Sequence, residues 1–249
     1  MKNIFNVCLL LLLLSNYACK KEEDIYVRSD TVIIGDYTHM VRHIFDTVIV
    51  FNVMPAYFDL DLDHDGEGDI RLISKKLGSY GIGYHPVSEL NCMTNKASVS
   101  GFYTQDTMFM YIDQSSSIGE DGKVHLDVQQ MFSCSPMSDH DTILGINPNV
   151  FKISVLTTND KINQETIFKT ASLILSDDSY GLPPETIIKP DTVMRIFVYN
   201  YNNCNTFPQD EVNYIGIRMM NGNEVRYGWI KLSIIANNKI IIYETAMQE

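Results

Sequence analysis

The chain has 249 residues, 45% of them hydrophobic, and carries a formal net charge of −12 at pH 7. This acidic balance argues against a nucleic-acid-binding protein, which needs a basic face, and against electrostatic attachment to a membrane surface. The length and the apolar fraction allow one large β domain or two small ones with a substantial hydrophobic core.

The N-terminal segment predicts export from the cytoplasm. A short basic start precedes an apolar stretch over Ile4–Ala18, which is shorter than the about 20 residues of a membrane-spanning helix. We therefore expect residues 1–18 to be a signal peptide. Ala18 and Cys19 resemble the lipobox of bacterial lipoproteins, although Asn16-Tyr17 departs from the usual residues of that motif. Ordinary cleavage followed by full secretion is the alternative.

The residues after the signal peptide predict a lipid-anchored tether. Residues 19–30 are polar, and the charged run Lys20–Asp24 resembles the segment that directs lipoproteins of Bacteroidota to the cell surface. The resemblance implies acylation of Cys19, a membrane partner through the lipid, and location at the outer membrane. The cell surface is the expected side, with the periplasmic face as the alternative. Stable attachment requires more than one acyl chain.

Strand patterns dominate the rest of the chain, whereas helical periodicity is scarce. Short β-branched or aromatic runs are bounded by turn residues throughout. We expect residues 31–249 to form a single all-β domain, an antiparallel β-sandwich of jelly-roll type with about ten strands. The expected strands are Thr47–Val53, Asp69–Ser74, Ser98–Tyr103, Thr107–Ile112, Lys123–Phe132, Ile167–Leu175, Thr192–Asn200, Val212–Met219, Glu224–Ile235 and Lys239–Thr245.

Four segments are less regular. Thr38–Phe45 fits either a short helix or a strand. Ser115–Gly122, Ser133–Asn149 and Leu175–Pro190 are polar, so we expect loops there. The last of them contains three prolines and is either a long loop across one sandwich, which we favour, or a linker between two halves.

An Asp-rich segment, Asp61–Asp69, predicts a calcium loop. Its carboxylates recur at alternate positions around Gly66, and calcium prefers six to eight oxygen ligands. An EF-hand would end in a glutamate at the twelfth position, where this chain has Leu72, so the loop is of a different type. It resembles the calcium hairpins of integrin-type propeller blades. The expected ligands are Asp61, Asp63, Asp65, the carbonyl oxygen of Glu67, and Asp69.

The alternative for this segment is a solvated acidic turn that binds no ion. Five carboxylates so close together would repel one another without a cation, which makes this alternative costly. Asp59 precedes the loop in the same phase and is the expected extra ligand. His64 falls between ligand positions, so we expect its side chain to face solvent.

Five cysteines must be assigned. Cys8 leaves with the signal peptide, and Cys19 is the expected lipid site. An odd number in an oxidising compartment predicts one disulfide and one buried free thiol among Cys92, Cys134 and Cys204. The sequence does not fix the pairing, and three separate buried thiols are the alternative.

The C-terminal region predicts a three-stranded antiparallel meander. Asn221-Gly222-Asn223 and Asn237-Asn238 separate the last three expected strands, and both contain residues that tolerate the positive φ of tight hairpin turns. Within the middle strand, alternation places Tyr227 and Trp229 on one face and Ile230 with Leu232 on the other.

Tyr227 and Trp229 are candidate binding residues. An exposed pair would form a platform on which a sugar ring can stack, whereas a buried pair would belong to the sandwich core, which we weigh as the better alternative. Gly228 between them indicates close approach of a neighbouring chain.

Three elements together resemble a set of uncharacterised secreted bacterial proteins, the Bacteroidota-type lipoproteins. These elements are the Asp-rich hairpin, Tyr227-Gly228-Trp229, and the closing Tyr243–Ala246. Proteins of the set carry an Asp-x-Asp-x-Asp-Gly-x-x-Asp-Phe element near the start, where this chain has Ile70 in place of phenylalanine, and a Tyr-Gly-Trp element near the end. The resemblance implies the fold and the calcium site, and it carries no activity.

The motifs of common catalytic sites are missing from the sequence. We therefore expect a lipid-anchored, calcium-stabilised β-sandwich that acts as a binding or adhesion module rather than as an enzyme. The expected partner is a glycan or another envelope protein. The alternatives are a polysaccharide hydrolase with unidentified carboxylates and a structural subunit of an envelope assembly.

Overall fold

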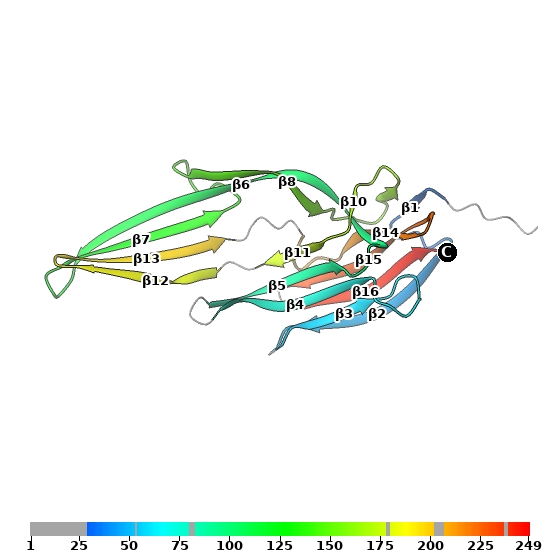
Figure 1. Ribbon diagram of the computed structural model, residues 1–249, viewed down its shortest axis with the longest axis horizontal. Coiled ribbons are helices and arrows are strands. Elements are labelled where there is room, and N and C mark those ends of the chain that lie inside the picture. Colours follow the sequence, from blue (N-terminus) through cyan, green and yellow to red (C-terminus); the bar gives the residue numbers. More distant parts are fainter. Residues whose placement is uncertain (1–28, 53, 80–82, 178–179, 202–206, 237–238) are drawn as a thin grey trace, which may run out of the picture.

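A computed structural model describes residues 29–249 except 53, 80–82, 178–179, 202–206 and 237–238. The described chain is all-β and contains sixteen strands (Figure 1). The strands are β1 (Thr31–Ile33), β2 (Met40–Val50), β3 (Ala56–Leu60), β4 (Ile70–Ser79), β5 (Gly83–Cys92), β6 (Ala97–Ile118), β7 (Val124–Ser133), β8 (Thr142–Ile153), β9 (Lys161–Asn163), β10 (Phe168–Lys169), β11 (Ser172–Asp177), β12 (Tyr180–Lys189), β13 (Thr192–Tyr201), β14 (Asn213–Asn221), β15 (Glu224–Ile235) and β16 (Lys239–Gln248).

The strands form three sheets. A ten-stranded sheet has the order β12-β13-β7-β6-β14-β15-β16-β2, with β8 and β10 also paired to β6. A four-stranded sheet has the order β11-β5-β4-β3, and β1 pairs with β9. All described strand pairs are antiparallel except β7 with β13, which is parallel. The expected antiparallel-rich β-sandwich is confirmed, while its jelly-roll connectivity stays a prediction.

The C-terminal meander is confirmed. Strand β14 pairs with β15 and β15 pairs with β16, both antiparallel. Asn221 lies opposite Glu224, so the first turn is a two-residue hairpin loop, and its Gly222 has φ +60°. The second expected turn, Asn237-Asn238, lies outside the described residues. A Cβ atom on Gly228 would lie 2.2 Å from the carbonyl oxygen of Ala246, which explains the glycine at that position.

Two hydrophobic clusters form the core, one on each face of the meander. The larger cluster joins the two main sheets and includes Ile230 and Leu232 of β15 with Leu60 and Leu72 of the smaller sheet. The second cluster lies on the opposite face, where Ile162 of β9 packs with residues of β1 and β15. The meander is therefore buried on both faces, which accounts for its long apolar strands.

Part of the large sheet extends beyond the sandwich as an arm (Figure 1). The arm consists of β12, β13, β7 and residues 109–118 of β6, where β6 pairs with β7. The expected loops at Ser133–Asn149 and Leu175–Pro190 are wrong, because most of β8 lies within the first and all of β12 lies within the second. The end of β6 also extends into Ser115–Gly122. Hydrogen bonding to distant strands overrides the polar composition of these segments.

The structure also describes part of the N-terminal half and two of the cysteines. Most of Thr38–Phe45 is strand β2 rather than helix. Cys134 is disulfide-bonded and Cys92 is a free thiol, in agreement with the predicted disulfide and free thiol, although Cys92 is half-buried rather than buried. Cys204 lies outside the described residues, as do residues 1–28, so the signal peptide and the acylation of Cys19 stay predictions.

The single domain over 31–249 also stays a prediction. Among the residues whose placement is described, no helix has the length and hydrophobicity to cross a membrane.

Candidate metal site

The Asp-rich loop connects β3 to β4 at the end of their hairpin. Leu60 and Ile70 form the last strand pair, and the N–H of Asp69 donates to the carbonyl oxygen of Leu60 at 2.8 Å. Leu62 is buried with Leu60 and Ile70 in the larger core. Its neighbours Asp61 and Asp63 are half-buried, and Asp65 is exposed.

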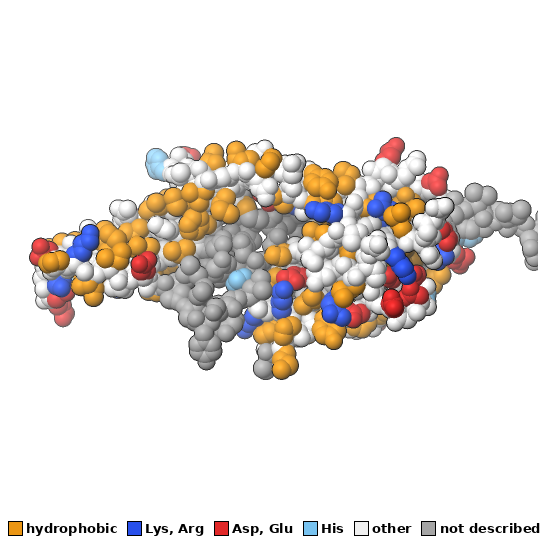
Figure 2. All heavy atoms as spheres, viewed as in Figure 1, with side chains coloured by type: hydrophobic (Ala, Val, Ile, Leu, Met, Phe, Trp, Pro, Cys, Tyr) orange, Lys and Arg blue, Asp and Glu red, His pale blue; other side chains and the backbone are white. Residues whose placement is uncertain are grey.

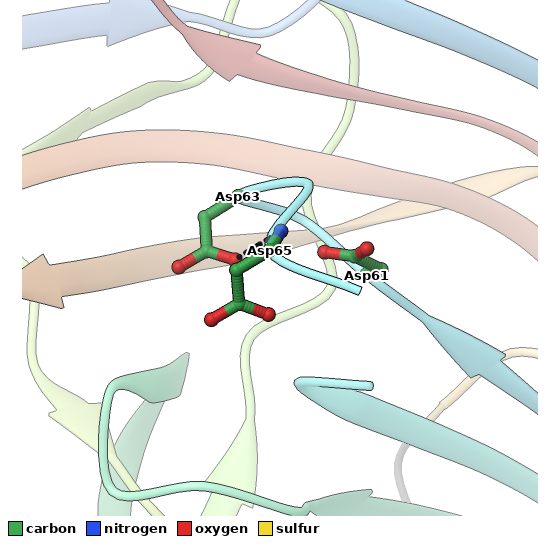
Figure 3. Close-up of side chains that lie close together, drawn as sticks. All are labelled: Asp61, Asp63 and Asp65. Carbon is green, nitrogen blue, oxygen red and sulfur yellow. Dashed lines mark hydrogen bonds between the residues drawn. The ribbon is translucent and has the colours of Figure 1, made fainter. Parts of the chain in front are cut away.

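Three carboxylates converge at this loop, and they are the first three of the predicted ligands (Figure 3). Asp61, Asp63 and Asp65 each offer one oxygen, and these three oxygens lie within 4.8 Å of one another. Calcium–oxygen distances are roughly 2.3–2.6 Å, so oxygens on opposite sides of one ion lie about 5 Å apart. The group can therefore hold a single metal ion.

Asp61 carries an oxygen that the protein itself does not satisfy. Its Oδ1 is buried and has no hydrogen-bond partner, while its Oδ2 accepts from the N–H of Gly66 at 3.0 Å. Gly66 has φ +92°, the left-handed backbone that brings this N–H back toward Asp61. A buried, unpaired carboxylate oxygen is costly, and a bound cation would remove that cost.

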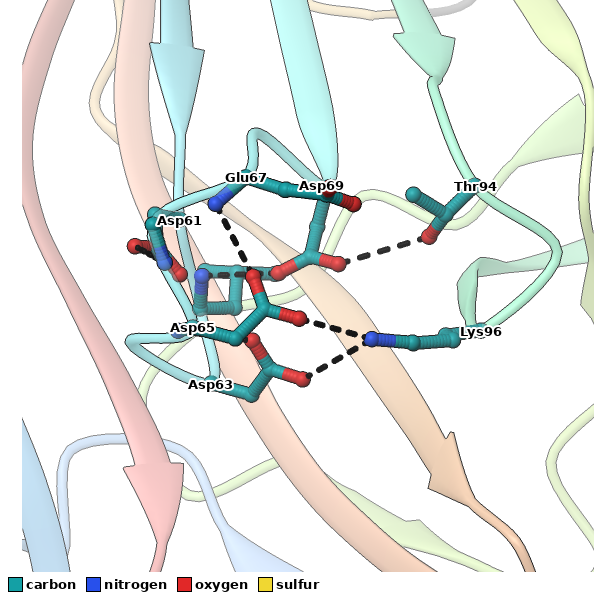
Figure 4. Close-up of polar contacts among 9 residues, drawn as sticks. Asp61, Asp63, Asp65, Glu67, Asp69, Thr94 and Lys96 are labelled. Atoms are coloured by element: carbon teal, nitrogen blue, oxygen red, sulfur yellow. Dashed lines mark hydrogen bonds and ion pairs between the residues drawn. The ribbon is translucent and has the colours of Figure 1, made fainter.

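Asp69 is the last residue of the loop, and its buried side chain accepts hydrogen bonds from within the site. Its side chain is buried, with Oδ2 accepting from the N–H of Leu62 at 2.9 Å and Oδ1 accepting from Thr94 Oγ1 at 3.3 Å (Figure 4). Burial raises the pKa of Asp69, and the nearby charges of Asp63 and Asp65 raise it further. Asp69 lies outside the convergent group of three, so its role as a ligand stays a prediction.

Glu67 is exposed, and its N–H donates to Asp65 Oδ1 at 2.9 Å. This hydrogen bond orients one ligand carboxylate. The predicted use of the Glu67 carbonyl oxygen as a ligand stays a prediction.

Lys96 is a part of the site that sequence analysis missed. It lies in the turn between β5 and β6, and its Nζ is 2.7 Å from Asp65 Oδ2 and 3.7 Å from Asp63 Oδ2 (Figure 4). The hydrogen bond from Lys96 lowers the pKa of Asp65, and the same bond raises the pKa of Lys96. The ammonium thus offsets part of the carboxylate repulsion when no ion is bound.

Two neighbours of the loop have other partners. Asp59 forms two hydrogen bonds with Arg71, at 2.6 and 2.8 Å, and the two residues are cross-strand partners. The guanidinium group thus occupies both oxygens of the expected extra ligand. His64 is exposed, as predicted, and its ring centroid lies 4.3 Å from that of His43 on β2.

The predicted stacking platform is wrong as a surface feature. Trp229 is 0% exposed and Tyr227 is buried beside it in the second core cluster. Val32 of β1, Ile34 directly after that strand and Ile162 of β9 cover this face. Tyr227 and Trp229 are core residues, the alternative that we preferred, and neither ring is accessible to a sugar.

No known protein family, curated protein or solved structure matches the chain. The resemblance to secreted Bacteroidota-type lipoproteins stays a prediction.

Proposed function

We propose that the Asp61–Asp69 loop binds calcium and that the protein is a calcium-stabilised module of the cell envelope. One observation carries the calcium proposal. Three carboxylates converge within 4.8 Å, and the Oδ1 of one of them, Asp61, is buried without a partner. In this proposal the cation bridges the start and the middle of the loop and thereby fixes the β3–β4 hairpin.

The chemistry of the ligands favours calcium among divalent cations. All three side chains are carboxylates, which suit hard cations, and the described group contains no cysteine or histidine that would favour zinc or copper. A loop of this kind adapts to the seven or so ligands of calcium more readily than to the strict octahedron of magnesium. Water and the carbonyl oxygen of Glu67 complete the coordination in this proposal.

The rest of the proposal concerns location. Cys19 carries the lipid, residues 20–30 span the distance to the folded part, and the module works at the outer membrane, on the cell surface. The features that support this part are the apolar N-terminal stretch and the Ala18-Cys19 pair.

The binding role has two candidate partners. Burial of Tyr227 and Trp229 removes the two residues that favoured a glycan. An envelope-protein partner is favoured by the large hydrophobic side chains that stay exposed on the arm, among them Ile112 and Ile118. We therefore propose a protein-binding or assembly role ahead of glycan binding and hydrolysis.

A calcium titration followed by amide NMR tests the site. The N–H of Gly66 donates to Asp61, so its signal reports directly on that carboxylate. We expect saturable shifts at Gly66 and Leu62 and none at Gly122, in the turn between β6 and β7 of the arm. Unsaturable shifts spread over many acidic surface residues would reject a defined calcium site.

A further inference from the structure

A small pocket borders the candidate metal site. Its volume is about 150 Å³, and its lining includes Asp63 and Asp65 of the loop together with Lys96. The β14–β15 hairpin adds Asn221 and Arg226 to the same lining. Pockets for whole small molecules usually measure about 300–1,000 Å³. This pocket therefore suits a single chemical group, such as a carboxylate, that projects from a larger partner.

Backbone pairing holds the segments around the pocket in place. The N–H of Met220 on β14 donates to the carbonyl oxygen of Lys96 at 3.0 Å. Met219 is the cross-strand partner of Ala97, the first residue of β6, and its side chain is buried in the larger core. Lys96 and Arg226 thus stand on or next to paired strands, so the sheet fixes their meeting at this pocket.

Two basic side chains at one pocket matter in a chain whose net charge is −12. Figure 2 shows acidic and basic side chains close together over the end of the sandwich farthest from the arm. The side chains of Lys96 and Arg226 are 36% and 34% exposed. Each has an acidic partner, Asp65 at 2.7 Å and Glu224 at 3.2 Å. The contact with Glu224 uses Nε of Arg226, and a guanidinium has further N–H donors.

Calcium would take away the acidic partners of Lys96. In the proposed function, calcium binds Asp63 and Asp65, the two carboxylates that Lys96 contacts (Figure 4). The ion would draw these oxygens toward itself and place two positive charges beside the ammonium. Lys96 would then lack a counter-charge, next to Arg226 in the same pocket. The pocket would thereby change from one that repels an anion to one that attracts it.

The coordination of calcium also leaves positions for a ligand. Calcium takes six to eight oxygens, and three carboxylates converge in the described group. Asp63 and Asp65 belong both to this group and to the pocket lining, so the pocket borders the coordination shell. A carboxylate there can replace water at the ion with one oxygen. Its other oxygen can accept charge-assisted hydrogen bonds from Lys96 or Arg226.

The rest of the lining favours a protein side chain over an acidic sugar. Met219 and Met220 both line the pocket, and flexible methionines adapt to peptide surfaces. Among the described residues that line it, none is aromatic, so a sugar ring has no surface for stacking. An aspartate or glutamate side chain, in contrast, delivers a carboxylate on a narrow stem.

We propose that the calcium-loaded pocket binds the carboxylate of an acidic side chain from a protein partner, with Lys96 and Arg226 as its basic contacts. This inference rests on the proposed function, because without calcium the loop carboxylates hold Lys96 and repel an anion. It adds the chemistry by which the partner is recognised, and it makes that recognition depend on calcium.

Amide NMR of the protein in saturating calcium tests the inference. The probe is the peptide acetyl-Gly-Glu-Gly-amide, and acetyl-Gly-Gln-Gly-amide is the uncharged control. We expect saturable shifts at Asn221 and Arg226 with the first peptide, and none with the second or in chelator. The dissociation constant should be on the order of millimolar, because the probe makes few contacts.

The signal of Gly66 separates the two proposals, because its N–H reports on calcium binding in the same samples. A Gly66 signal that responds to calcium, with no shift from the glutamate peptide, would overturn this inference and leave the calcium site standing. A Gly66 signal that does not respond to calcium would reject both. Equal binding of the two peptides would also overturn the inference.

Variants test the two basic contacts. Arg226→Gln should weaken binding of the glutamate peptide roughly three- to tenfold and leave calcium affinity unchanged. Lys96→Gln should weaken the peptide by a similar factor while calcium binds more tightly, and a general loss of structure would not produce these opposite changes. Circular dichroism on each variant checks the fold.

Arg195→Gln is the matched control. Arg195 lies on the arm, is 43% exposed, and forms an ion pair with Asp127 at 2.7 Å. This variant should bind the glutamate peptide like the wild type. Equal weakening in Arg226→Gln and Arg195→Gln would overturn the proposed contact. Tighter binding of methyl glucuronide than of the glutamate peptide would overturn the choice of a protein partner.

Discussion

The Nζ atom of Lys96 lies 2.7 Å from Oδ2 of Asp65, although the two residues are 31 positions apart in the sequence. The ammonium thus lies beside the carboxylates that are proposed to bind calcium, and it also approaches Asp63. A cation that binds these oxygens must displace Lys96 or share the carboxylates with it. Lys96 therefore stabilises the ion-free loop and competes with calcium.

Removing the positive charge of Lys96 should separate its stabilisation of the ion-free loop from its competition with calcium. We expect Lys96→Gln to lower the melting temperature in chelator, because carboxylate repulsion is less compensated, and to raise calcium affinity roughly three- to tenfold. Lys161→Gln changes the same charge at an exposed position of β9 and should alter neither quantity. Unchanged affinity in Lys96→Gln would show that Lys96 does not compete with the ion.

A buried carboxylate near the C-terminus predicts a specific acid sensitivity. Burial tends to raise the pKa of Glu244, but hydrogen bonds from Tyr37 and Arg42 outweigh it and hold this pKa below its usual value of 4.5. Burial, together with the hydrogen bond to Glu244, raises the pKa of Tyr37 to about 12. The phenol therefore stays protonated and donates its hydrogen bond to Glu244.

The pKa of Glu244 is lower in the folded state than in the unfolded state. The ionised side chain therefore contributes to stability above about pH 4.5, and this contribution is lost as the pH falls through the folded-state pKa. We expect the melting temperature of the wild type to fall more steeply below pH 4.5 than that of Glu244→Gln. Glu165→Gln, at an exposed position, should follow the wild type. Parallel curves for wild type and Glu244→Gln would contradict this assignment.

Peptide mapping should find Cys134 linked to Cys204. Ser133 and Tyr201 are paired at the ends of β7 and β13, Cys134 directly follows Ser133, and Cys204 is three residues after Tyr201 in the sequence. The link would close a loop of 204 − 134 = 70 residues, and the chain-entropy description assigns such a loop about 4 kcal/mol. Cys134→Ser should therefore lower the melting temperature by roughly 10 °C.

Cys92 provides the comparison. Burial raises the pKa of its thiol, so it should react slowly with alkylating reagents until the protein is denatured. Cys92→Ala should lower the melting temperature by only about 2–4 °C. A peptide that joins Cys92 to either of the other two cysteines would contradict this pairing.

The anchor is tested in cells. If Cys19 is acylated, Cys19→Ala should move the protein out of the membrane fraction and leave the signal peptide uncut or cut elsewhere. Detergent partitioning that does not change in this variant would rule out the lipoprotein assignment.

Local patterns predicted much of this fold, and non-local contacts account for what they missed. Alternation in β15 correctly separated Trp229 from Ile230, because the side-chain period of a strand depends only on the chain itself. Whether the Trp229 face was covered depended on β1 and β9, which lie far away in sequence. The same holds for Leu175–Pro190, a polar, proline-bearing segment that becomes strand β12 through pairing with β13.

In the candidate metal site, too, local sequence predicted some residues, and distant contacts determine the others. The spacing of Asp61, Asp63 and Asp65 is a local property, and these three residues do converge. Lys96 and Thr94 enter the site from the turn between β5 and β6, and their spacing in the sequence carries no signal for that approach. Asp59 has the phase of a ligand, but its cross-strand partner Arg71 binds both its oxygens.

The central claim is that the Asp61–Asp69 loop binds calcium and thereby stabilises the fold, and thermal unfolding in chelator and in calcium tests it most directly. Extracellular calcium modules have dissociation constants of roughly 10⁻⁴–10⁻³ M, and free calcium at ten times that value stabilises by about 1.4 kcal/mol. We expect a rise in melting temperature of about 3–6 °C. The rise should be lost in Asp63→Asn, retained in His64→Ala, and small when magnesium replaces calcium. Equal melting temperatures in chelator and in millimolar calcium would contradict the account.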